Sequence, residues 1–97
     1  MTIEQKLIDL GGNLWESGNH RRIYLNNWLE LAGVNVSRYQ TGNISSASIN
    51  GKKISNAKAA ELDNVKAFWD CSANALVFQG SARMLDDIAP LLKKAIY

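Results

Sequence analysis

The first pattern along the chain is a repeat of apolar residues with helical spacing. Between residues 3 and 10 they recur at intervals of three and four positions, which predicts a short helix with one buried face. Thr2 and Gln5 stand at the spacing of a capping box, and Gly11-Gly12 ends the pattern, as glycine often does beyond a helix C-terminus. We expect this helix to cover the core.

A hairpin is predicted directly afterwards, with strands over residues 14–16 and 20–25 around the turn Ser17-Gly18-Asn19. Glycine and asparagine tolerate the positive φ that a tight turn requires. Side chains alternate between the two faces of a strand, and we expect one face of the second strand to lie in solvent. The solvated face carries His20, Arg22 and Tyr24, and the other carries Arg21, Ile23 and Leu25.

The clearest turn signal is Asn50-Gly51, because this pair is preferred in two-residue type I′ turns. With these residues as the turn, Ile49 lies opposite Lys52 and Ala47 lies opposite Ile54. The register follows from the turn geometry, and it predicts a second hairpin with a modest apolar face.

Two further short helices and a third hairpin are predicted from the rest of the middle of the chain. Residues 28–32 present a broad apolar face and residues 57–62 are rich in alanine, and both patterns favour helix. Residues 65–71 and 76–79 alternate as strands. The candidate helix caps are Asn26 or Asn27 and Ser55 or Asn56, and the hairpin face that we expect to be buried carries Val65, Ala67, Trp69 and Cys71.

The final segment has the strongest amphipathic pattern in the chain. From Met84 to Ile96, apolar residues recur at intervals of three and four, which predicts a helix with one continuous apolar face. Pro90 interrupts this pattern, so we expect either a kink near residues 86–90 or a fresh helix start with Pro90 in its first turn.

The succession of hairpins and helices predicts an α+β fold, in which a small antiparallel sheet built from hairpins is covered by short helices and the amphipathic C-terminal helix. The chain has 97 residues, of which 46% are hydrophobic. This length and composition fit one globular domain over residues 1–97. The strand order stays open.

Charge and cysteine content exclude several classes of protein. With 11 Lys or Arg against 9 Asp or Glu, the formal net charge is +2, so any binding signal must come from the local distribution of charge. The single cysteine excludes a disulfide-stapled scaffold. No signal peptide or membrane span is visible, and we expect a cytoplasmic protein with no membrane partner.

The candidate chemistry argues against an enzyme or a metalloprotein. His20 and Cys71 are the only residues of their types and belong to separate hairpins, so nothing in the sequence pairs a nucleophile with a base. A structural zinc site needs about four Cys or His ligands. Asp86-Asp87 are adjacent on a helix and point in different directions. We therefore expect no catalytic residues, no metal and no cofactor.

A basic and aromatic constellation gives the leading hypothesis, a small non-enzymatic module that binds nucleic acid. Arginine and lysine would neutralise phosphates while tyrosine offers a face for base stacking, which suits single-stranded or irregular nucleic acid. The hypothesis requires the first two hairpins to be neighbours, and the simpler alternative is a solvated basic strand edge. The candidate residues are His20, Arg21, Arg22, Tyr24, Arg38, Tyr39, Lys52 and Lys53.

A protein partner or self-association is the alternative function, as in an inhibitory accessory protein. The apolar face of the final helix, with Trp15 or Trp28 if either is exposed, would then form the interface. The simpler interpretation is that this helix closes the intramolecular core. An enzyme of unknown class is a distant third hypothesis.

Overall fold

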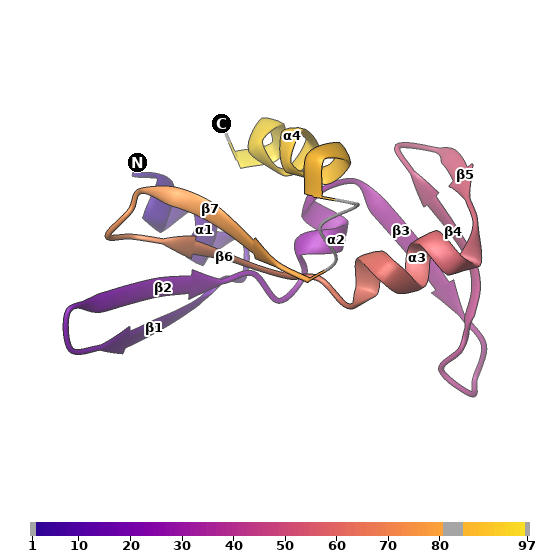
Figure 1. Ribbon diagram of the computed structural model, residues 1–97, viewed down its shortest axis with the longest axis horizontal. Helices are drawn as coiled ribbons and strands as arrows, with labels where there is room; N and C mark the ends of the chain where they lie inside the picture. Colours follow the sequence, from indigo (N-terminus) through magenta and orange to yellow (C-terminus); the bar gives the residue numbers. More distant parts are fainter. Residues whose placement is uncertain (1, 81–84, 97) are drawn as a thin grey trace.

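The computed structural model describes residues 2–80 and 85–96 of the chain, and it confirms the α+β class (Figure 1). Every strand pairing is antiparallel, as expected for strands connected through short turns. The elements are α1 (Ile3–Asp9), β1 (Asn13–Ser17), β2 (His20–Tyr24), α2 (Trp28–Leu31), β3 (Val34–Arg38), β4 (Ile44–Ile49), β5 (Lys52–Ile54), α3 (Asn56–Asp63), β6 (Lys66–Asp70), β7 (Ala75–Gln79) and α4 (Leu85–Ile96).

The strands are divided between two sheets. One has four strands in the order β1-β2-β6-β7, and the other has three in the order β3-β4-β5. The molecule is elongated, with extents of 40 × 26 × 25 Å, and the two sheets lie toward opposite ends of its long axis (Figure 1). The nucleic-acid hypothesis required the first two hairpins to be neighbours, but they belong to different sheets and do not lie side by side.

Local signals in the sequence fix the turns. Asn50 and Gly51 both have positive φ, at 49° and 84°, as a type I′ turn requires. Ala47 faces Ile54 and Ile49 faces Lys52, so the predicted register of this hairpin is confirmed.

Helix capping follows the sequence only in part. The hydroxyl of Thr2 accepts a hydrogen bond from the Gln5 N–H at 3.2 Å, and Ser55 caps α3 in the same way. The Gln5 side chain donates to the Asp9 carboxylate instead of completing a capping box. Asn27 occupies the N-cap position of α2 without a side-chain cap hydrogen bond, and its Nδ2 donates a hydrogen bond of 3.4 Å to the Leu10 carbonyl.

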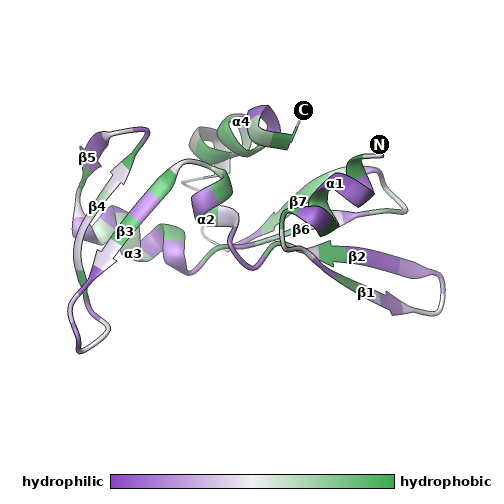
Figure 2. Cartoon of the chain, turned by 180° about the vertical axis from the view of Figure 1, so that it is seen from behind, coloured by the Kyte–Doolittle hydropathy of each residue, from purple (hydrophilic) through white to green (hydrophobic). Residues whose placement is uncertain are grey.

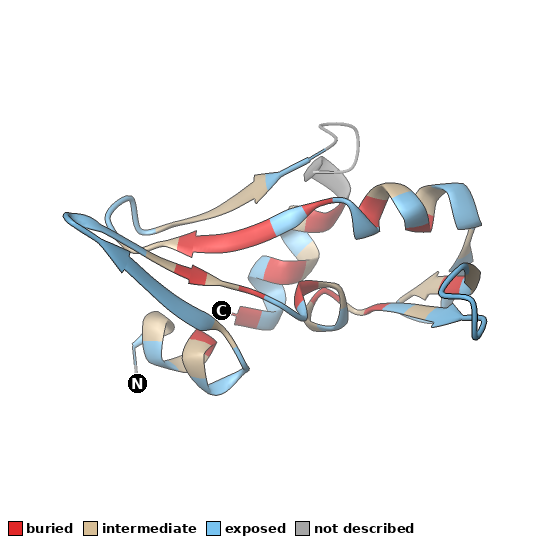
Figure 3. Ribbon diagram, turned by 90° about the horizontal axis from the view of Figure 1, so that it is seen from below, coloured by how far each residue is buried: buried red, intermediate tan, exposed pale blue. Residues whose placement is uncertain are grey.

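The main core lies between one face of the four-stranded sheet and the helices α1 and α4. Ile23 and Trp69 face each other across β2 and β6, and both belong to the same buried cluster as Leu7 of α1 and Ile88 and Leu92 of α4. Figure 3 shows the buried residues gathered on β6 and α4, and Figure 2 shows the hydrophobic residues of α4. The predicted buried face of the third hairpin is thus confirmed, with Cys71 only partly buried.

The C-terminal helix closes this core. Ile88, Leu92 and Ile96 are buried, each at 2% exposure or less, so these positions of the apolar face pack within the chain. Pro90 lies inside α4, and the alternative of a fresh start with Pro90 in the first turn is wrong. Met84, where the predicted helical pattern begins, lies outside the described residues.

Trp28 connects the two halves of the molecule. Its indole Nε1 donates a hydrogen bond of 2.9 Å to the Val65 carbonyl at the start of β6, and its ring meets that of Phe78 edge-on at 5.9 Å. Both Trp28 and Val65 are buried. A segment at the end of the first sheet is thereby fixed to α2, which leads into the second sheet.

Candidate nucleic-acid interface

The candidate site is the face of the four-stranded sheet opposite the core, which we call the outer face and define by Trp15, Arg22, Tyr24, Lys66 and Phe68. In the ladder, Trp15 faces Arg22 and Tyr24 faces Phe68. The intervening residues on β2 and β6 point into the core, so strand alternation places these side chains on the other side. The helices α1 and α4 pack against the core side.

Three aromatic rings form a cluster on the outer face. The rings of Tyr24 and Phe68 lie 5.3 Å apart at a tilt of 41°, and Trp15 meets Tyr24 edge-on at 6.5 Å. Phe68 is only 3% exposed although it lies outside the main core cluster, whereas Trp15 remains 43% exposed. The sequence treated this face of β2 as solvated, but Arg22 and Tyr24 are half-buried because they cover Phe68.

Arg22 lies over this aromatic cluster. Its Cζ atom is 4.9 Å from the Phe68 ring centroid and 5.8 Å from that of Trp15, within the range of cation–π attraction. Its Nε is buried and has no hydrogen-bond partner among the described residues. Asp70 lies opposite Arg22, but its carboxylate accepts from the N–H groups of Ser72 and Ala73 in the following turn.

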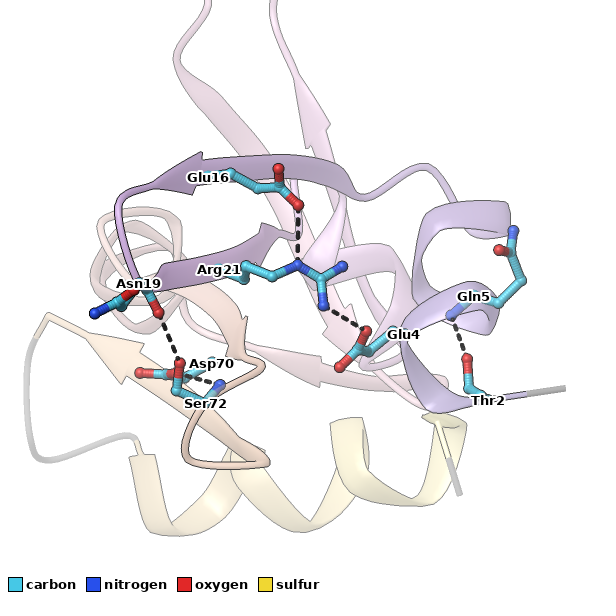
Figure 4. A network of polar contacts seen from close by, with 8 residues as sticks. All are labelled: Thr2, Glu4, Gln5, Glu16, Asn19, Arg21, Asp70 and Ser72. Carbon is cyan, nitrogen blue, oxygen red and sulfur yellow. Dashed lines mark hydrogen bonds and ion pairs between the residues drawn. The ribbon is translucent and has the colours of Figure 1, made fainter.

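Arg21 has a different role from its neighbour. It forms ion pairs with Glu16 at 2.9 Å and with Glu4 of α1 at 3.3 Å on the opposite side of the sheet (Figure 4). The hydrogen bond to Glu16 and the negative charge of Glu4 raise the pKa of Arg21. Its charge is already compensated, so Arg21 and Arg22, both candidate residues for nucleic acid, differ in their availability to a ligand.

The remaining predicted residues do not join the aromatic cluster. His20 lies on the same side of β2 as Arg22, but it is exposed at the start of the strand, next to the hairpin turn. Arg38 at the end of β3 pairs with Asp63 at 2.8 Å and donates to the Gly42 carbonyl. The rest of the set lies in or next to the three-stranded sheet, with exposed side chains: Tyr39, Lys52 and Lys53.

Sequence reasoning missed Phe68 as a site residue. Its alternation with Lys66 and Asp70 put it on the correct face, but the pairing of β6 with β2 was needed to bring it under Arg22. Trp15 is likewise absent from the candidate residues for nucleic acid given above. A search for aromatic residues in register across strands would find such a cluster once the strand order is known.

A cleft of about 600 Å³ opens beside the outer face, toward the second sheet, and it brings two of the predicted residues, Tyr24 and Arg38, to one site. Lys66 of the outer face also lines it. The cleft therefore continues the surface on which the aromatic cluster lies.

Within residues 2–80 and 85–96, no group of three His, Cys, Asp or Glu side chains comes together to hold a metal ion. Burial, followed by the charge of Glu4, raises the pKa of the Cys71 thiol. The neutral thiol is thereby favoured, whereas a nucleophilic cysteine requires the thiolate.

Comparisons of the chain with protein-family models, with curated proteins and with solved structures find no match. Of the helices in the described part of the chain, none is both long enough and apolar enough to span a membrane.

Proposed function

We propose that this protein is a small non-enzymatic binding module that contacts single-stranded nucleic acid through its outer face. The proposal is carried by Arg22, which lies between the rings of Trp15 and Phe68 and has no ion pair among the described residues. An arginine placed in this way can offer the N–H groups of its two terminal nitrogens to a phosphate while the rings hold its plane.

Each residue of the outer face has a distinct role in the proposed complex. The exposed ring of Trp15 stacks on a base, which single-stranded nucleic acid presents without the cost of opening a duplex. Arg22 and the exposed Lys66 neutralise phosphates. Phe68 packs against the guanidinium group of Arg22, and Tyr24 packs against Phe68. With two phosphate contacts, the slope of log K against log salt is about −1.4, at about 0.7 per contact with a single strand.

The test is a titration of fluorescein-labelled single-stranded and duplex oligonucleotides over a salt series. We expect single strands to bind more tightly than duplexes, and Arg22→Ala to weaken binding about tenfold, as expected for hydrogen bonds to a charged group. The same change should reduce the salt slope by about 0.7.

Lys53→Ala is the matched control, because it removes the same charge from an exposed strand of the other sheet. We expect it to leave affinity within twofold of the unmodified protein. Equal losses in the Arg22 and Lys53 variants would point to diffuse electrostatics and reject the outer face. Absence of binding to any oligonucleotide at low salt would reject nucleic acid as the ligand.

A protein partner stays a second candidate because of the edge strand β1. All five residues of β1 are exposed, including Leu14 at 45%, and β1 ends the four-stranded sheet. An unpaired edge of this kind can accept a strand from another chain. Concentration-dependent self-association in light scattering that Leu14→Lys abolishes would support this candidate, and a monomer at all concentrations would count against self-pairing.

A further inference from the structure

The cleft beside the outer face combines an apolar lining with polar groups at its surface. Buried Leu25, Val34 and Val65 contribute apolar surface. Asn26 and Asn35, both exposed, are also among the residues that line it. A volume of about 600 Å³ falls within the range of pockets that enclose small organic ligands.

Two of the three asparagines that line the cleft have no side-chain hydrogen bond with the described residues. The side chains of Asn26 and Asn35 make none, whereas the amide of Asn27 donates to the Leu10 carbonyl. Each such amide offers two donors and one acceptor oxygen. An asparagine amide of this kind can pair with the edge of a planar heterocycle.

The charges of the cleft compensate one another. Arg38 forms an ion pair with Asp63 at 2.8 Å, and the remaining charged residues of the lining are Lys66 and Glu30. With two positive and two negative groups, the cleft has no excess charge to attract a free phosphate anion. A neutral ligand with polar edges fits this lining better.

The cleft and the outer face are continuous. Tyr24 packs on Phe68 in the aromatic cluster and also lines the cleft, as does Lys66. Arg22 stands two residues before Tyr24 on the same face of β2, which corresponds to about 6.6 Å along a strand at 3.3 Å per residue. A strand whose phosphate contacts Arg22 can therefore present a neighbouring base at the mouth of the cleft.

We propose that the cleft binds one unpaired nucleobase of the strand that lies on the outer face, and that adenine is preferred. This inference rests on the proposed function. Asn26 and Asn35 supply the amides, because an asparagine amide pairs in a bidentate manner with N6 and N7 of adenine. Tyr24 borders the base, and Lys66 contacts the phosphate that precedes or follows it.

The experiment compares binding of labelled A6, C6 and U6 oligonucleotides by the unmodified protein and by the Asn26→Ala/Asn35→Ala double variant. We expect the unmodified protein to prefer A6 about tenfold, in line with the discrimination that bidentate base contacts provide. In the double variant this preference should fall below twofold, while affinity for U6 and the salt slope stay unchanged. Asn43→Ala, an exposed loop asparagine outside the cleft lining, is the control.

A second measurement does not depend on a variant. In NMR spectra of the unmodified protein, the side-chain amide signals of Asn26 and Asn35 should shift on addition of A6, while that of Asn43 stays in place. One outcome would overturn the cleft proposal alone: salt-dependent binding that Arg22→Ala weakens, with no base preference and no shift of these amide signals. The proposed function of the outer face would then still stand. Failure to bind any of the three oligonucleotides at low salt would reject both.

Discussion

Replacement of Trp28 by phenylalanine should destabilise the protein far more than the same replacement at Trp15. Trp28→Phe removes the donor of the 2.9 Å hydrogen bond to the Val65 carbonyl, and Val65 is 2% exposed, so water has little access to this acceptor. An unpaired buried acceptor costs about 1–3 kcal/mol. Because the smaller ring also leaves space in the core, we expect the free energy of unfolding to fall by about 2–4 kcal/mol.

The measurement is urea unfolding followed by far-UV circular dichroism, together with calorimetric Tm values. For a domain of this size the loss corresponds to a Tm lower by about 8–20 °C. Trp15→Phe is the matched control, because Trp15 is 43% exposed, and we expect it to change the free energy of unfolding by less than about 0.5 kcal/mol. Equal stability of the two variants would refute the structural role assigned to the indole of Trp28.

Two further predictions concern close packing and the thiol. Gly12→Ala should destabilise the protein by about 1–3 kcal/mol, because a Cβ there would lie 2.5 Å from Ile23 Cγ2. A free energy of unfolding in urea equal to that of the unmodified protein would contradict this. Burial, followed by the negative charge of Glu4, raises the pKa of the Cys71 thiol. The stability that this thiol contributes is therefore fully present below the ordinary thiol pKa and is lost as pH rises through the raised value. Alkylation rates measured against pH should titrate at higher pH in the native protein than in the urea-unfolded protein, and coincident profiles would disprove the shift.

Hairpins and helix caps were predictable because their determinants are local. Asn50 and Gly51 adopt the positive φ of a type I′ turn, and the turn then fixes which residues face each other. The cap at Ser55 follows from its hydroxyl, which accepts from the Lys58 N–H at 3.1 Å. Such features depend on a few adjacent residues, so a sequence pattern is enough to place them.

The arrangement of the hairpins was not predictable on the same basis. Nothing near β2 in the sequence indicates that it pairs with β6 rather than with β3 or β4. This choice is made by the core, where Ile23 meets Trp69 across the pairing and both contact the same buried cluster. Strand order is decided by packing between elements that are distant in the sequence, and it cannot be predicted from local propensity.

The same limit explains the changed picture of the candidate site. Strand alternation correctly separated Arg21 from Arg22, and alternation alone assigned Arg22 to solvent. The approach of Phe68 to within 4.9 Å of its Cζ atom depends on the β2–β6 pairing, and it converts a solvated arginine into one held against an aromatic ring. Arg38 is likewise committed by Asp63, which lies on α3 far along the chain.

The outer face and the cleft depend on the core for their geometry. Leu25, which follows Tyr24, donates its N–H to the Ala67 carbonyl at 3.0 Å, next to Phe68, and this bond holds the ends of β2 and β6 together where the two surfaces meet. Trp28 and Val65, joined by their buried hydrogen bond, both line the cleft. The residues that would bind a strand are thus positioned by the contacts that fold the chain, so a ligand would meet a surface formed before binding, with little ordering cost to offset.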